Sequence, residues 1–240
     1  MKNLKFSAIA LSVLLVFSSC NMSNTTKGGL IGGGSGALLG GIVGNLVGGN
    51  AGGTIIGAAI GGAIGTGAGV LIGKKMDKAK AAAQAVQNAQ VESVTDANGL
   101  QAVKVTFDSG ILFASGSSEL SSSAKASLNQ FANSVLKQNT DMDVAILGHT
   151  DNTGFRGVTS AEENANRNLT LSQQRAQAVS NYLTAQGVSY SQIRSVQGLG
   201  QTSPVADNST PAGKAQNRRV EVFLYASEAM INAANNGTLQ

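Results

Sequence analysis

A single histidine and a single cysteine limit the chemistry that this chain of 240 residues can perform. His149 stands in the sequence GHTD, where a metal site or a catalytic triad could be imagined. A structural zinc site takes four ligands, most of them cysteine or histidine. No serine lies in a nucleophile-elbow motif beside a second histidine. The residue inventory therefore argues against an enzyme, and we expect no catalytic residues, no metal site and no cofactor.

The charged side chains argue against a nucleic-acid-binding protein. The chain has 17 Lys and Arg, 13 Asp and Glu, and a formal net charge of +4. Removal of an export signal over residues 1–19 would take two lysines with it, which leaves 15 basic and 13 acidic residues and a net charge of +2. Tryptophan is absent and no basic cluster is interleaved with aromatic residues, so the usual electrostatic footprint of nucleic-acid binding is missing.

The first twenty residues have the layout of an export signal. Two lysines precede a short apolar run that ends in small residues and Cys20. The end of this run, FSSC, resembles the lipid-attachment signal of bacterial lipoproteins, although Phe17 stands where a leucine-like residue is usual. We therefore expect a signal peptide over 1–19, acylation of Cys20 with palmitate, and a lipidated tether over 20–27 that leads into the periplasm. The other interpretation is an uncleaved membrane anchor with a cysteine present by chance.

Residues 28–73 contain no charged side chain and have glycine at every fourth position in two series. One series runs from position 28 to position 52, and the other, one residue out of phase, runs from position 49 to position 73. A spacing of four places the glycines along one stripe of a helix, where they let a second helix approach closely. The change of phase indicates a turn, so we expect a helical hairpin made of residues 28–47 and 54–73.

Each expected helix of this hairpin could cross a membrane. Twenty residues at about 1.5 Å per residue span roughly 30 Å, the thickness of a hydrocarbon core. The pair resembles the glycine-zipper segments of bacterial envelope lipoproteins, and two spans would return the rest of the chain to the side where Cys20 is anchored. A flexible glycine-rich linker is one alternative. Another is a self-assembling envelope scaffold or pore, a homo-oligomer in which the glycine stripes pack between molecules.

Downstream of the glycine series the sequence becomes that of an ordinary folded domain. Residues 74–94 lack glycine and proline, so we expect a helical spacer over 74–99 that ends in the turn TDANG. Apolar spacing then predicts six elements: strand 100–107, helix 120–135, strand 143–149, helix 171–186, and strands around 192–200 and 217–225. The order β-α-β-α-β-β predicts an α+β fold with helices on one side of a mixed sheet, followed by a tail over 227–240.

Five motifs in this region carry a family resemblance. They are, in order, FDSGILFASGSSEL, ILGHTDNTG, NLTLSQQRAQAVSNYL, GLGQTSPVADN and GKAQNRRVEV. Together they resemble the OmpA-like peptidoglycan-binding domain over residues 100–226. The resemblance implies a ligand, the diaminopimelate side chain of peptidoglycan stem peptides, which ends in an ammonium and a carboxylate. Without the resemblance, the spacing of these residues predicts instead that Asp151 stabilises its own turn and that Arg175 lies on a solvated helix face.

The family motifs, matched position by position, imply the residues of a binding site. Asp151 would meet the ligand ammonium and Arg175 the ligand carboxylate. A guanidinium can hold a carboxylate through two hydrogen bonds, which a lysine cannot do. The resemblance also implies that the side chains of Asn168 and Arg218 line the pocket. It further implies backbone hydrogen-bond donors near Thr153 and Gly154, and a supporting role for Asn217.

The chain departs from the compact family pattern in residues 155–167, where FRGVTSAEENANR adds about ten residues to a loop beside the implied pocket. This insertion adds contacts through Arg156 or Arg167, or it is merely a longer surface loop, and it leaves Asn166 as an alternative to Asn168.

Flagellar stator subunits resemble the same domain, but they depend on an ionisable residue in the membrane, which residues 28–73 lack. We therefore expect a non-catalytic outer-membrane lipoprotein that links the membrane to peptidoglycan.

Overall fold

The structure, a computed structural model, describes residues 64–96 and 98–240. The expected signal peptide, Cys20, the tether over 20–27, the helix over 28–47 and the first half of the helix over 54–73 lie outside the described residues. These expectations therefore stay predictions, and the following description concerns the part of the chain from residue 64 onward.

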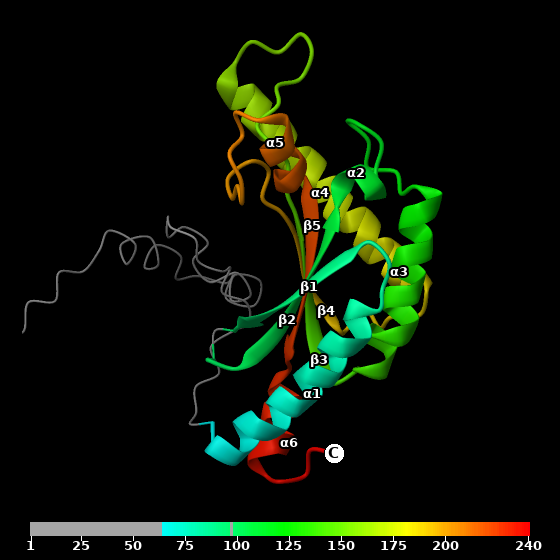
Figure 1. Cartoon of the computed structure of the whole chain (residues 1–240), viewed down its shortest axis with the longest axis vertical. Helices are drawn as coiled ribbons and strands as arrows, with labels where there is room; N and C mark the ends of the chain where they lie inside the picture. Colours follow the sequence, from blue (N-terminus) through cyan, green and yellow to red (C-terminus); the bar gives the residue numbers. More distant parts are fainter. Residues whose placement is uncertain (1–63, 97) are drawn as a thin grey trace, which may run out of the picture.

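A five-stranded mixed sheet forms the centre of the described region, with strand order β1-β2-β5-β3-β4 (Figure 1). Neighbouring strands run antiparallel, except that β3 and β4 are parallel. The strands are β1 (Ala89–Thr95), β2 (Gln101–Asp108), β3 (Met142–Gly148), β4 (Ile193–Gly198) and β5 (Arg219–Ala226). The last four coincide closely with the strands that apolar alternation predicts, so this part of the sequence-based fold is confirmed.

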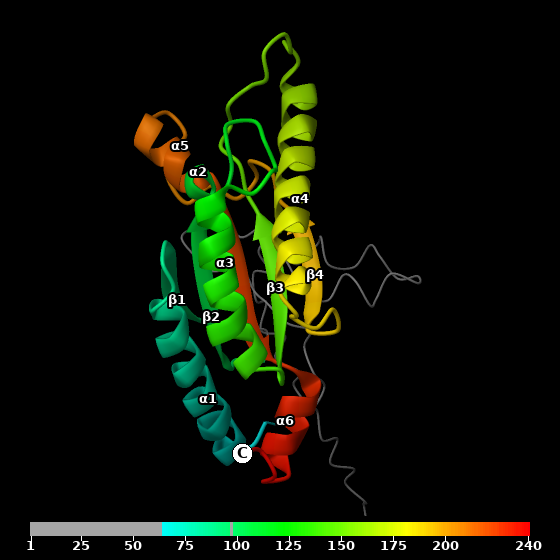
Figure 2. The same cartoon turned by 90° about the vertical axis from the view of Figure 1, so that its right-hand side faces the viewer.

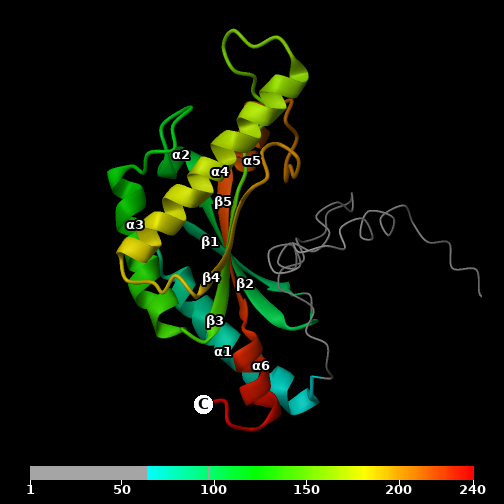
Figure 3. The same ribbon diagram turned by 180° about the vertical axis from the view of Figure 1, so that it is seen from behind.

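Three long helices cover one face of this sheet. They are α1 (Thr66–Gln84), α3 (Ser122–Ser134) and α4 (Ala161–Ala185), which lie side by side in Figure 2. Seen from behind in Figure 3, α4 runs along β3 and β4, with which it makes extensive contacts. Four shorter helical segments complete the part of the chain that the structure describes: α2 (Ser109–Leu112), η2 (Leu136–Gln138), α5 (Pro211–Asn217) and α6 (Glu228–Asn235). The expected α+β class with helices on one side of a mixed sheet is confirmed.

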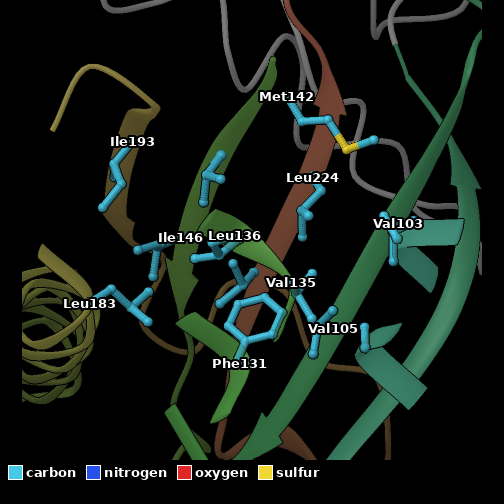
Figure 4. Packing of buried hydrophobic residues seen from close by; sticks show 14 of the residues in the cluster. Val103, Val105, Phe131, Val135, Leu136, Met142, Ile146, Leu183, Ile193 and Leu224 are labelled. Atoms are coloured by element: carbon cyan, nitrogen blue, oxygen red, sulfur yellow. The ribbon is translucent and has the colours of Figure 1, made fainter. Parts of the chain in front are cut away.

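The main core lies between the sheet and these helices. Alternate residues of β5, Val220, Val222 and Leu224, are fully buried on the helix side. Phe131 of α3 packs edge-on against Phe107 of β2, with ring centroids 5.7 Å apart, and it sits among aliphatic side chains from several strands (Figure 4). Such interlocking of aromatic and branched side chains fixes the position of each helix on the sheet.

Glycines at the ends of β3 and β4 let α4 approach the sheet closely. A Cβ atom at Gly148 would collide with the backbone carbonyl oxygen of Ser172, and one at Gly198 would collide with the backbone of Gln173. Only a residue without a side chain fits at either position. This close approach matters for function because α4 carries Arg175 and β3 leads directly into Asp151.

The expectation of a continuous helical spacer over 74–94 is wrong in its second half. The helix α1 ends at Gln84, and residues 89–95 form β1, an edge strand paired antiparallel with β2. Asn88, between the two elements, has a positive φ of 61°, a conformation that asparagine tolerates but a helix does not. The TDANG turn therefore joins two strands, with the Asp96 carboxylate accepting hydrogen bonds from the backbone of Asn98 and Leu100.

The helix α1 also begins earlier than expected, inside the segment assigned to a second membrane span. Ala68, Ile72 and Met76 lie on its buried face and belong to the domain core. Residues 66–73 thus pack against the protein core, which does not fit their assignment to a membrane span. No helix of the region from residue 64 onward is both long and apolar enough to cross a membrane. A Cβ at Gly69 would meet nothing within 4 Å, so packing within the domain does not explain the glycine spacing.

The two ends of the domain carry different elements. The start of α1 and the C-terminal helix α6 lie together at one end, whereas α2, α5 and the first turns of α4 lie at the other (Figures 1 and 2). The core extends beyond the expected 100–226, because it includes residues of α1 and α6. The chain that precedes α1 therefore joins the domain at the end opposite to α2 and α5.

Candidate ligand-binding pocket

A pocket of about 530 Å³ opens at the end of the domain that carries α2 and the start of α4. Its walls come from four places in the sequence: the loop after α2, the turn after β3, the first half of α4, and the residue before β5. Six of the seven expected site residues line it, namely Asp151, Thr153, Gly154, Asn168, Arg175 and Arg218, whereas Asn217 does not. Residues separated by up to about a hundred positions are thus brought together by the sheet.

Asp151 is the acidic group of this pocket. Its side chain is almost completely buried, with Oδ1 accepting a hydrogen bond from the Thr153 backbone N–H (2.8 Å) and Oδ2 accepting one from Arg218 Nη1 (2.5 Å). Burial alone would raise the pKa of Asp151, but these bonds outweigh it and hold the pKa below the usual value. The carboxylate is therefore ionised at neutral pH. It does stabilise its own turn, and in addition it holds an arginine 67 residues away.

Arg175 lies opposite, on α4, and is only 3% exposed. Its Nε donates to the carbonyl oxygen of Ser117 (2.9 Å), its Nη2 lies 3.5 Å from that of Ala114, and its guanidinium stands over the Phe113 ring at 5.2 Å. The solvated helix face that spacing alone suggests for Arg175 is wrong. Burial and the charge of Arg218 lower its pKa, yet a guanidinium stays protonated in proteins.

No carboxylate of the described residues forms an ion pair with Arg175. A buried charge normally has a partner of opposite sign, because desolvation of an isolated ion is costly. Arg175 has carbonyl oxygens and an aromatic face instead, and it points its charge at the pocket. The geometry is that of a site prepared for an anionic group of a ligand.

Asn168 and Asn217 have supporting roles. Asn168, which is buried, donates from Nδ2 to the Thr153 carbonyl oxygen (3.1 Å) and to Gln201 Oε1 (3.2 Å), and so holds the turn that carries Asp151. Asn166, the alternative that the sequence left open, is exposed. Asn217 is fully buried, and its Oδ1 accepts from the backbone N–H groups of Val205 and Ala206. It fixes the loop before α5 and thereby the position of Arg218.

Several residues of the pocket were not singled out from the sequence. Ser109 and Thr150 line it with buried hydroxyl groups that have no hydrogen-bond partner among the described residues. Phe113 and Ala114, which contact Arg175, belong to the first family motif but carry no charge that would mark them. The unpaired hydroxyls are polar groups that a bound ligand or water can satisfy.

A cluster of buried charges lies beside the pocket, on the face of the sheet opposite the long helices. Arg219 Nε donates to Glu221 Oε1 (2.8 Å), and His149 Nε2 lies 3.3 Å from Glu221 Oε2. Burial lowers the pKa of His149, so this ring is neutral at neutral pH. The only histidine therefore lies inside a structural ion pair network next to the turn of Asp151. The described residues hold no group of three His, Cys, Asp or Glu side chains placed to bind a metal.

The charge cluster predicts how stability depends on pH. Burial alone would raise the pKa of Glu221, but His149 and Arg219 lower it from 4.5 to about 2. Because the pKa is lower in the folded state, the stabilisation is complete above about pH 4.5 and is lost as the pH falls toward 2. We expect Glu221 alone to account for a loss on the order of 3 kcal/mol across this range. Urea unfolding at several pH values checks this, and an equally steep acid loss in Glu221→Gln would contradict it.

Comparisons with known proteins agree with the fold. Residues 112–218 match the model of the OmpA family, and residues 1–77 match the model of the YMGG-like Gly-zipper family. A solved structure described as a putative MotB-like protein from Desulfovibrio vulgaris superposes with a TM-score of 0.51 at 23% identity, over 67% of this chain and 92% of that one. At this identity the likeness concerns the fold alone.

Three curated relatives are more similar to this chain in sequence. The probable lipoprotein YiaD of Escherichia coli is 48% identical over 38% of this chain and 36% of its own length. The outer-membrane lipoprotein YfiB of Pseudomonas aeruginosa is 35% identical over 49% of this chain and 64% of its own length. The peptidoglycan-binding protein ArfA of Mycobacterium tuberculosis is 45% identical over 40% of this chain and 26% of its own length.

The chain thus spans less than two thirds of the length of each of these relatives. By these matches the chain is similar to the OmpA family over residues 112–218 and to the YMGG-like Gly-zipper family over residues 1–77.

Proposed function

We propose that this protein is a non-catalytic envelope lipoprotein that binds peptidoglycan through the pocket and tethers the outer membrane to the cell wall. The observation that supports this most directly is the buried, unpaired guanidinium of Arg175 facing the ion pair of Asp151 and Arg218. Such a pocket suits a ligand with both a carboxylate and an ammonium. The names of the relatives, a peptidoglycan-binding protein and two lipoproteins, agree with the proposal.

The diaminopimelate end of a stem peptide has the required chemistry. Its carboxylate would bind the Arg175 guanidinium, and its ammonium would bind Asp151, which keeps acceptor capacity because a carboxylate offers about four lone-pair sites. The backbone around Thr153 and Gly154 and the side chain of Asn168 would shape the site. Arg218 would share Asp151 with the ligand ammonium or turn toward a ligand oxygen, since its side chain is 38% exposed.

The arrangement of the domain suits a tether. Acylation of Cys20 would hold the N-terminal segment at the membrane, and the chain enters the domain at the end opposite to the pocket. The pocket would then face away from the anchored end, toward the wall. The wall offers many identical stem peptides, and confinement near it raises the effective ligand concentration, so a site of modest affinity suffices.

The proposal is tested by sedimentation of the full chain in detergent with isolated sacculi. We expect the protein to sediment with the sacculi and to be released by free diaminopimelate but not by 1,5-diaminopentane at the same concentration. This diamine is diaminopimelate without its two carboxylates, so it keeps the ammonium groups but offers nothing to the Arg175 guanidinium. A protein that stays in the supernatant with and without sacculi would contradict the proposed function.

A further inference from the structure

The insertion over residues 155–167 builds one wall of the pocket. Phe155 and Arg156 line it, directly after the turn that carries Asp151. The side chain of Asn164 holds this loop: its Oδ1 accepts from the Phe155 backbone N–H (2.7 Å), and its Nδ2 donates to the carbonyl oxygens of Val158 and Ser160. Residues from 161 onward extend α4 by about two turns. The insertion is therefore an ordered part of the site and not a loop that merely passes over it.

The two arginines of the insertion differ in their surroundings. Arg167 donates from Nη2 and Nε to Glu163 Oε1 (2.7 and 3.1 Å), and its guanidinium stands 6.0 Å from the centre of the Phe155 ring. Arg156 is exposed, lines the pocket and forms no ion pair with any described residue. Of the two candidates that the sequence offered, Arg156 is thus the one whose charge is available to a ligand.

The side chains that line the pocket carry an excess of positive charge. Asp151 is the one acidic residue of this lining, and Arg156, Arg175 and Arg218 are its basic residues. The ion pair of Asp151 and Arg218 leaves two cationic groups, Arg175 and Arg156, that no described carboxylate pairs with. A ligand with one ammonium and one carboxylate is neutral and would leave this excess in place. A ligand with a second carboxylate would complement it.

We propose that Arg156 forms a second anion subsite, which makes the pocket select stem peptides that carry a free carboxylate in addition to the zwitterionic end. This inference rests on the proposed function and adds a specificity-determining residue to it. Diaminopimelate stem peptides have two such groups nearby, one on the γ-linked glutamate that precedes diaminopimelate and one at the peptide end. Conversion of either group to an amide removes its charge with little change in shape.

Isothermal titration of the full chain in detergent tests this subsite. The probes are a diaminopimelate tetrapeptide with both carboxylates free and two versions in which either the glutamate carboxylate or the terminal carboxylate is an amide. For the parent we expect one of the two amidations to weaken binding about fivefold. For Arg156→Gln the free peptide should bind about fivefold more weakly, and the same amidation should have no further effect. The amide that causes the loss identifies which carboxylate Arg156 binds.

Arg167→Gln serves as the matched control, because it removes the other arginine of the insertion and should leave the effect of amidation unchanged. Equal losses on amidation in the parent and in Arg156→Gln would overturn the subsite, as would the absence of any loss in the parent. In both cases the parent still binds the tetrapeptide, so the proposed function survives. A parent that binds none of the three peptides would overturn the proposed function and the subsite together.

Discussion

Asp151→Asn and Arg175→Lys should each lower the affinity of the full chain for sacculi by at least tenfold. The first change keeps the size of the side chain and removes its charge, and the second keeps the charge and removes the planar fork. The first thus removes the charged acceptor of the ligand ammonium, and the second removes one of the two hydrogen bonds that a guanidinium donates to a carboxylate. One charge-assisted hydrogen bond is worth about 1.5–3 kcal/mol, which corresponds to roughly 10- to 100-fold in affinity. Sedimentation at a series of sacculus concentrations measures the effect.

Asp143 and Arg194, on β3 and β4, offer a matched pair of control substitutions. Asp143, near the start of β3, lies 3.7 Å from Arg194, near the start of β4, at the end of these parallel strands away from the pocket. Asp143→Asn and Arg194→Lys repeat the two chemical changes without touching the pocket, so retention should stay within twofold of the parent. Equal retention of the site variants and the control variants would remove Asp151 and Arg175 from the binding site.

A structural effect of the Arg175 substitution must be separated from an effect on binding. Arg175 also holds the loop after α2 through the carbonyl oxygens of Ala114 and Ser117. We expect Arg175→Lys to unfold at a somewhat lower urea concentration but to remain folded under the conditions of sedimentation. If a variant that is still folded no longer sediments with the sacculi, the substitution has affected ligand binding. Asp151→Asn gives independent information, because it alters a different wall of the pocket.

The apolar pattern of the sequence predicted four of the five strands, β2 to β5, and the two helices between them, since each has a buried face of the right period. The helix α4 begins at Ala161, ten residues before the predicted start. It did not predict β1, whose sequence AQVESVT has few large apolar residues and follows a run of good helix formers. Pairing with β2 makes these residues a strand, and that contact is tertiary. The glycine spacing led to the assignment of the first turns of α1 to a membrane helix, although Ala68 and Ile72 lie on the helix face that packs against the core.

The pocket was predictable only in part. Family motifs pointed to Asp151 and Arg175, but nothing local to Arg175 shows that it is buried, because the loop that covers it lies some 60 positions earlier in the chain. The pairing of Arg218 with Asp151 likewise spans 67 positions. The sequence of the insertion could not distinguish Arg156 from Arg167. The two arginines differ because Arg167 lies one helical turn after Glu163 and pairs with it, whereas Arg156 lies on the side of the loop that faces the pocket.

The largest expected effect on stability concerns α1, which the sequence had divided between a membrane span and a spacer. Ile72 and Met76 are fully buried in the domain core. Replacing a buried Ile or Met with Ala costs about 2–5 kcal/mol, and a domain has only about 5–15 kcal/mol of stability in total. The double variant Ile72→Ala/Met76→Ala should therefore lose a large part of the unfolding free energy. Urea unfolding of the full chain in detergent, followed by circular dichroism, measures the loss.

Val70, on the same helix, provides the control because it is 58% exposed, and Val70→Ala should change the unfolding free energy by less than about 0.5 kcal/mol. If residues 54–73 crossed a bilayer as a complete span, Ile72→Ala would leave the stability of the domain unchanged, and that outcome would contradict the packing described for α1. If the loss is found, α1 is part of the folded domain itself. Under the proposed function, tension between Cys20 and the wall would then act on the first turns of α1, and the burial of Ile72 and Met76 would help to hold the domain closed against it.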